Sequence, residues 1–96
     1  MIVHVCMFKL KEENRAENLD KAIRMAEGLM DQKPVIGGSV VCNSDQAPQD
    51  NYDLCLLFRF NNIDDLNAYQ NDFQHQIFKK FIATVMESRA CIDYEY

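Results

Sequence analysis

The segment YDLCLLFRF, residues 52–60, carries the strongest secondary-structure signal in the chain. It is a continuous apolar run broken only by Asp53 and Arg59, and a run of this length is typical of a buried strand. Side chains of a strand alternate between its two faces, so one face is formed by large apolar residues. The segment therefore predicts a strand whose buried face consists of Leu54, Leu56, Phe58 and Phe60.

A second strand is predicted at the start of the chain, in IVHVCMFKL, residues 2–10, because this segment is rich in β-branched and aromatic residues. One face of this strand carries Ile2, His4, Cys6, Phe8 and Leu10. The other face carries Val3, Val5, Met7 and Lys9. Both faces are largely apolar, so we expect both to be covered.

Between these strands, residues 11–30 change to helical spacing, with one apolar stripe that runs from Leu19 to Met30. Asn14, followed three residues later by Glu17, predicts a capped helix start. Pro34 prevents continuation of the helix. Glycines then lead into a further strand, SVVCN, residues 39–43.

After residue 60 the chain predicts two helical pieces and a final strand. Residues 61–71 form a short helix with Asn61 or Asn62 as its cap, and residues 73–87 form a second, more apolar helix. RACIDYEY, residues 89–96, alternates as a closing strand. The polar segment 43–51 is predicted to be a loop.

The resulting order is β-α-β-β-α-β, which predicts an α+β, ferredoxin-like fold with a four-stranded antiparallel sheet. We expect residues 1–96 to form a single domain. Right-handed connections place both helical regions on one face of the sheet, leaving the other face bare. That face is too apolar to meet water, so we expect a homodimer in which two sheets pack together and close a barrel.

Composition excludes several kinds of partner. The chain has 15 acidic and 10 basic residues, a net charge of −5, and no cluster of lysines and arginines to neutralise phosphates. We therefore expect neither nucleic acid nor anionic membranes as partners. The first residues lack the pattern of a signal peptide, and no run approaches the roughly 20 apolar residues of a membrane span. We expect a cytoplasmic protein.

The four cysteines, Cys6, Cys42, Cys55 and Cys91, all fall in predicted strands. None forms the tight paired spacing typical of zinc ligands. Disulfides are rare in the cytosol, so we expect buried, reduced thiols. No phosphate-binding glycine loop, nucleophile elbow or zinc signature is present, and we expect no cofactor and no metal.

Three residues are candidates for chemistry: His75, Tyr69 and His4. His75 lies at the edge of the apolar stripe of its helix, where it is either a packed boundary residue or a proton-transfer group with a pKa near neutrality. His4 lies on an otherwise apolar strand face, so its ring needs a hydrogen-bond partner or a wet cavity. Tyr69 is either a core tyrosine or a donor to a developing oxyanion.

Four segments of the chain resemble, in the same order, motifs of the stress-responsive dimeric α/β-barrel (Dabb) family. They are the opening strand IVHVCMFKLK, the strand NYDLCLLFRF, the helical YQNDFQHQIF and the closing CIDYEY. The resemblance runs nearly end to end. It implies a ferredoxin-like fold and a homodimer with a central barrel, in agreement with the topology derived above.

The resemblance also implies a pocket. One plant branch of the family is a cofactor-free polyketide cyclase that performs an intramolecular aldol condensation, and its pocket histidines and tyrosine correspond by motif to His4, Tyr69 and His75. In that interpretation His75 is the base, Tyr69 orients or polarises a carbonyl, and His4 supports binding. The chain departs from the family's H-P-x-H pattern at Asp72 and Phe73, and Phe73 is expected to change the helix junction and narrow the pocket mouth.

Three functions therefore stay open at the level of sequence. The first is a pocket that binds, or transforms by cofactor-free acid–base chemistry, a small aromatic or polyketide-like molecule. The second is a non-enzymatic, stress-linked dimer in which His4 and His75 are structural. The third is a barrel-type monooxygenase of the same fold, acting with haem or dioxygen.

Overall fold

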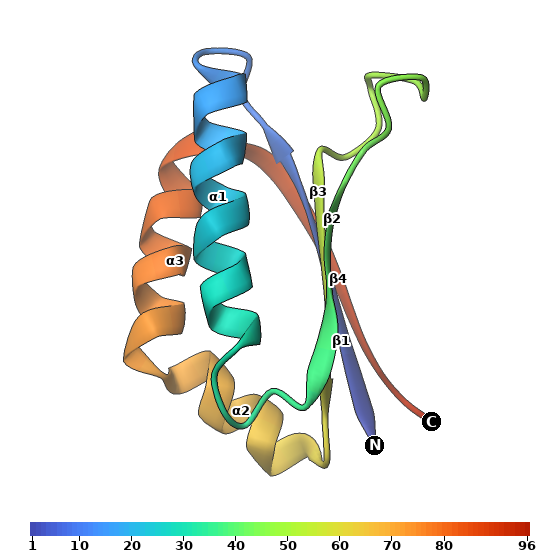
Figure 1. The fold of residues 1–96 in the computed structure, drawn as a ribbon, viewed down its shortest axis with the longest axis vertical. Coiled ribbons are helices and arrows are strands. Elements are labelled where there is room, and N and C mark those ends of the chain that lie inside the picture. The colour runs from blue at the N-terminus through green and yellow to red at the C-terminus, as the bar shows by residue number, and fades with distance from the viewer.

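The computed structural model of the chain describes residues 1–96. Four antiparallel strands form one sheet in the order β2-β3-β1-β4 (Figure 1). The strands are β1 (Ile2–Leu10), β2 (Gly37–Cys42), β3 (Leu54–Phe60) and β4 (Met86–Glu95). The helices are α1 (Arg15–Met30), α2 (Ile63–Asn71) and α3 (Phe73–Val85). The predicted ferredoxin-like order, with its second helical region split in two, is confirmed.

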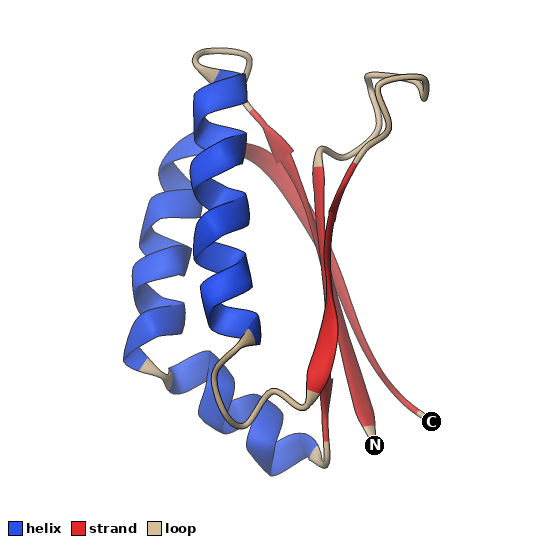
Figure 2. Cartoon of the chain, in the orientation of Figure 1, coloured by secondary structure: helices blue, strands red, loops and turns tan.

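All three helices lie on the same side of the sheet, as Figure 2 shows. The four apolar residues of β3 that were predicted to share a face are each exposed by 2% or less, and they pack beneath the helices. The face of β1 that carries His4 also points toward the helices. His4 is therefore enclosed between the sheet and the helices.

The outer face of the sheet is covered by no element of the chain (Figure 1). On that face Val41, Ile92 and Tyr94 are exposed by 51%, 61% and 44%. The register aligns Ile92 with Val5 and Tyr94 with Val3, so the apolar side chains of two strands adjoin. This is the bare apolar face expected from the sequence.

The helix starts agree with the expected positions but not always with the expected chemistry. Asn62 caps α2, because its side-chain oxygen accepts a hydrogen bond from the backbone N–H of Asp65 at 2.8 Å. Asn14 precedes α1 but adopts a left-handed conformation and makes no side-chain capping bond. The expected capping contact at Asn14 is therefore wrong, although the helix begins at the next residue.

The prediction of four buried, reduced thiols is wrong. Cys6 and Cys91 form a disulfide between β1 and β4, while Cys42 is exposed and Cys55 is half-buried. The two bonded cysteines are 85 positions apart in the sequence, so their spacing gave no sign of a pair. They meet because β4 lies beside β1 with Cys6 directly opposite Cys91.

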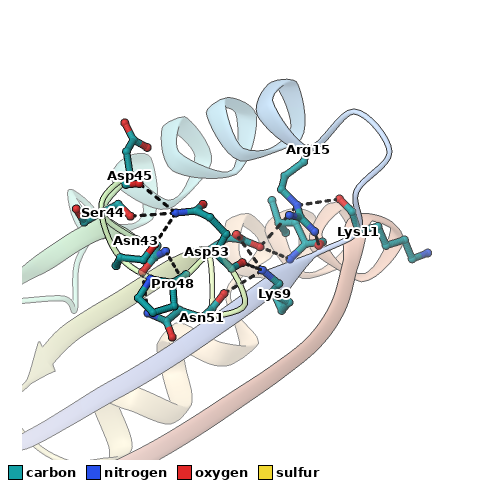
Figure 3. Close-up of polar contacts among 12 residues, drawn as sticks. Lys9, Lys11, Arg15, Asn43, Ser44, Asp45, Pro48, Asn51 and Asp53 are labelled. Carbon is teal, nitrogen blue, oxygen red and sulfur yellow. Dashed lines mark hydrogen bonds and ion pairs between the residues drawn. The ribbon is translucent and has the colours of Figure 1, made fainter.

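The polar loop between β2 and β3 projects from one end of the sheet, away from both chain termini (Figure 1). Asp53, at the end of this loop, is buried and accepts a hydrogen bond from the backbone N–H of Leu10 at 2.7 Å. Lys9 donates to backbone oxygens of Gln49 and Asn51 and contacts the Asp53 carboxylate at 3.4 Å (Figure 3). These contacts tie the loop to β1, so Asp53 has a structural role.

No helix has the length and apolar character needed to cross a bilayer.

Candidate functional site

A pocket of about 340 Å³ lies between the sheet and the two C-terminal helices. We call it the histidine pocket, because both histidines of the chain line it. Its 15 lining residues come from β1, β3 and β4 on the sheet side, and from α2 and α3 on the helix side. The three candidate residues named from the sequence are thus brought together in one cavity: His4, Tyr69 and His75.

Tyr69 stands between the two imidazole rings. Its ring centroid is 4.7 Å from that of His75 and 6.1 Å from that of His4. On its other sides the ring packs against Phe58 and Phe60 at 5.8 and 5.2 Å, and the residue is only 3% exposed. α2 holds it there, since Leu66, three residues earlier on the same helix face, is also buried in the core.

The phenol oxygen of Tyr69 is not used in packing. The Tyr69 hydroxyl forms no hydrogen bond with the protein. Every side-chain nitrogen or oxygen that is fully shielded from solvent does have a hydrogen-bond partner. The oxygen must therefore retain contact with the open space of the pocket. Burial raises the pKa of Tyr69 well above its usual range, so the phenol is protonated at neutral pH and is available as a hydrogen-bond donor.

His75 is half-buried at the start of α3, directly across from Tyr69. Its Nδ1 lies 3.1 Å from the backbone oxygen of Gln70. A carbonyl oxygen can only accept, so Nδ1 donates the hydrogen and the neutral ring keeps a lone pair on Nε2. Desolvation lowers the pKa of His75, partly opposed by this hydrogen bond, while the proximity of His4 and Lys79 lowers it further. His75 is accordingly a neutral base at pH 7.

His4 is buried on β1 and bonded through Nδ1 to the carboxylate of Asp93 on β4. The carboxylate holds the His4 ring in one orientation, with Nδ1 toward Asp93 and Nε2 directed away from it. His4 thus has the partner that a buried ring on an apolar face requires. The pair places an oriented imidazole in the sheet wall of the pocket, across from the neutral base on α3.

This arrangement suits proton transfer at a carbon acid. A neutral imidazole can accept a proton, and a protonated phenol beside it can donate a hydrogen bond to an oxygen that gains negative charge. No set of three or more histidine, cysteine, aspartate or glutamate side chains is arranged to hold a metal ion.

Sequence reasoning missed several residues of the pocket. Asp93, Arg89 and Lys79 line the pocket, but none of them was among the candidate residues named from the sequence. The β1–β4 register shows why Asp93 and Arg89 belong there, because it aligns His4 with Asp93 and Phe8 with Arg89 on the helix-facing side. Alternation along 89–96 indicates which residues share a face but not which face is inward.

At the helix junction, Asp72 and Phe73 stand where the family pattern H-P-x-H has its first histidine and its proline. Asp72 caps α3, because its carboxylate accepts a hydrogen bond from the backbone N–H of Gln74 at 2.9 Å. Phe73 is 72% exposed and is not among the residues that line the histidine pocket. The expected narrowing of the pocket mouth by Phe73 is therefore wrong.

A second hollow, of about 490 Å³, lies at the loop end of the sheet. It is lined by residues of β2, β3 and the 43–53 loop together with Met7, and it contains no histidine. No residue of the 43–51 segment lines the histidine pocket, so in this structure the loop does not close over it.

Comparison with known proteins agrees with this fold. The family model described as Stress responsive A/B Barrel Domain matches residues 2–96. No curated protein matches the sequence significantly. A dimeric protein of unknown function with a ferredoxin-like fold from Bacteroides fragilis is 26% identical, with a TM-score of 0.86, over 99% of this chain and 95% of that one.

Two further solved structures share the fold at lower identity. A dimeric ferredoxin-like protein of unknown function from Thermobifida fusca is 18% identical, with a TM-score of 0.88, over 99% of this chain and 90% of that one. A protein from Nitrosomonas europaea, named as a candidate antibiotic biosynthesis monooxygenase, is 18% identical, with a TM-score of 0.80, over 100% of this chain and 98% of that one. At this identity both comparisons concern the fold alone.

Proposed function

The chain belongs to the stress-responsive α/β-barrel family, and we propose that its histidine pocket binds and transforms a small organic molecule by cofactor-free acid–base chemistry. The substrate class is an aromatic or polyketide-like carbonyl compound. One observation carries the proposal: a buried phenol with an unbonded hydroxyl stands beside His75, whose hydrogen bond to Gln70 leaves Nε2 free, and beside His4, which Asp93 orients.

The proposed step is removal of a proton from a carbon next to a carbonyl group. Nε2 of His75 accepts the proton, because Nδ1 is held in the protonated form by the Gln70 carbonyl. The Tyr69 hydroxyl donates a hydrogen bond to the carbonyl oxygen, where the negative charge of the enolate develops. His4, oriented by Asp93, contacts the bound molecule from the sheet side. The enolate can then attack a second carbonyl of the same molecule, as in an aldol condensation.

Deuterium exchange tests this step without knowledge of the natural substrate. The probe is 2′-hydroxyacetophenone, whose methyl protons exchange slowly with deuterated water, followed by proton NMR. We expect the protein to accelerate this exchange and His75→Ala to remove the acceleration, since a positioned general base contributes about 10²–10⁴-fold. If His75→Ala exchanges the ketone as fast as the wild-type protein, the base assignment is wrong.

A phenol outside the histidine pocket provides the matched control. Tyr52 lines the hollow at the loop end, so Tyr52→Phe should exchange the ketone at the wild-type rate. Tyr69→Phe should slow exchange while leaving the fold intact. Absence of exchange in the wild-type protein, together with unchanged histidine NMR signals on addition of the ketone, would instead favour the non-enzymatic dimer in which both histidines are structural.

We further propose that residues 1–96 act as one cytoplasmic domain that pairs with a second copy through the outer face of the sheet. The support is the exposed apolar surface around Ile92 and Tyr94, together with the dimeric state of the related proteins from Bacteroides fragilis and Thermobifida fusca. The histidine pocket lies on the helix side of the sheet, so each copy would keep its own pocket.

A further inference from the structure

The Cys6–Cys91 disulfide occupies an unusual place, because both cysteines line the histidine pocket. β1 and β4 contribute successive facing pairs to this wall: His4 with Asp93, then Cys6 with Cys91. The acid–base chemistry proposed above does not use the sulfur atoms. A disulfide that borders a solvent-reached cavity is open to a small reactant, unlike one sealed in a core.

We propose that Cys6–Cys91 is a thiol–disulfide exchange site that takes low-molecular-weight thiols, of the glutathione type, through the histidine pocket. The two sulfurs differ in access. Cys6 is 4% exposed on the central strand β1, whereas Cys91 is exposed on the edge strand β4. Exchange begins at the accessible sulfur, so Cys91 is the sulfur that is attacked and Cys6 is the leaving group.

The reaction balances with two thiols and no other reagent. The first thiol ionises, its thiolate attacks Sγ of Cys91, the Cys6–Cys91 bond breaks, and Cys6 leaves as a thiolate that takes up a proton. The second thiolate attacks the sulfur of the first thiol in the mixed disulfide, and Cys91 leaves as a thiolate and is protonated. The products are a dithiol protein and one oxidised thiol dimer, and the reverse sequence restores the protein disulfide.

Charges at the pocket favour an anionic thiol. Arg89 on β4 lies opposite Phe8 on β1, two residues along from the Cys6–Cys91 pair and on the same face of the sheet. Lys79 lines the pocket from α3. Both are exposed cations of the pocket that Cys91 also lines, and they attract a thiolate or a carboxylate-bearing thiol. Asp93 is the opposing charge on this wall, and it is bonded to His4.

Reduction need not disturb the fold. β4 is paired with β1 along nearly its whole length, from Ile2 with Glu95 to Leu10 with Met86, so the strand stays in place without the disulfide. The side chains of both cysteines also face the helices rather than the outer sheet face. A second copy on that outer face therefore leaves the site reachable.

Mass spectrometry of the purified chain of residues 1–96 tests the proposal. The chain is treated with millimolar reduced glutathione under native conditions, quenched with acid, denatured and alkylated with a maleimide. We expect two alkylated cysteines before treatment, Cys42 and Cys55, and four after it, with an unchanged circular dichroism spectrum. Reduction that occurs only in denaturant, or that unfolds the chain, would identify the disulfide as purely structural and overturn the proposal.

Single variants test which sulfur is attacked. With oxidised glutathione, Cys6→Ser should form a mixed disulfide at Cys91 at least about tenfold faster than Cys91→Ser forms one at Cys6, because access controls the rate. Cys55→Ser, which alters a half-buried thiol outside the pair, should behave as the wild-type protein. Equal rates at the two positions would contradict entry through Cys91.

Discussion

Replacement of Tyr69 by phenylalanine removes a single oxygen from a side chain that is otherwise fully packed. The Tyr69 ring is within 6.1 Å, between centroids, of His4, Phe58, Phe60 and His75, and the residue is 3% exposed. Phenylalanine can keep every one of these ring contacts. The substitution therefore isolates the hydroxyl, which is the group on which the structural and functional interpretations of Tyr69 differ.

The expected change in stability follows from the hydrogen bonds of that hydroxyl. Loss of a typical buried hydrogen bond lowers the free energy of unfolding by about 0.5–1.5 kcal/mol. The Tyr69 hydroxyl has no protein partner, so we expect Tyr69→Phe to change the free energy of unfolding by less than about 0.5 kcal/mol. Tyr69→Ala removes the ring as well and should cost about 3–5 kcal/mol, in line with large aromatic deletions from a core.

Urea unfolding followed by circular dichroism measures both variants, with Tyr52→Phe as the reference for removal of a phenol oxygen outside the histidine pocket. The same Tyr69→Phe protein should lose about 10²–10³-fold in ketone exchange, the effect of deleting one oxyanion donor. Intact stability combined with lost exchange identifies a hydroxyl kept for chemistry. If Tyr69→Phe unfolds more easily by over about 1 kcal/mol, the hydroxyl is a structural donor and the reasoning fails.

Two further predictions concern His75 and the outer sheet face. Burial lowers the pKa of His75, so as pH falls the histidine is protonated in the unfolded chain before it is protonated in the folded one. The free energy of unfolding should therefore fall as pH drops below about 6.5, by at most about 1.4 kcal/mol per pH unit. His75→Gln should flatten this part of the profile measured by urea unfolding, and an unchanged slope would contradict it. Ile92→Asp should convert a dimer into monomers in sedimentation velocity, because burying the carboxylate at the interface costs several kcal/mol, whereas Thr84→Asp on exposed α3 should not. A stable wild-type monomer would refute pairing through this face.

The fold could be predicted from sequence because its determinants are local. Alternation in 52–60 and 2–10, the helical stripe after residue 15 and the Asn62 cap each depend on residues within a few positions of one another. Their order then leaves few topologies open. The capping contact at Asn14 failed because that residue adopts a left-handed backbone, which residue type alone does not reveal.

The candidate site could be predicted only in part. His4, Tyr69 and His75 were found because each is an unusual residue at its own position: a histidine on an apolar strand face, a tyrosine on an inward helix face, and a histidine at the edge of an apolar stripe. Their shared cavity depends on the packing of α2 and α3 against the sheet. That packing is a property of the whole fold and cannot be read from spacing.

What sequence reasoning could not supply is the register between the first and last strands. A shift of one residue in β4 would turn Cys91 and Asp93 to the outer face and leave both Cys6 and His4 without partners. The observed register instead sets an acid–base pair and a sulfur pair side by side in one pocket wall. Because His4 and Cys6 lie on the central strand β1 and their partners lie on the edge strand β4, movement of β4 alone would affect both pairs at once. The closing strand therefore determines the chemistry of the pocket as much as the helix that carries His75.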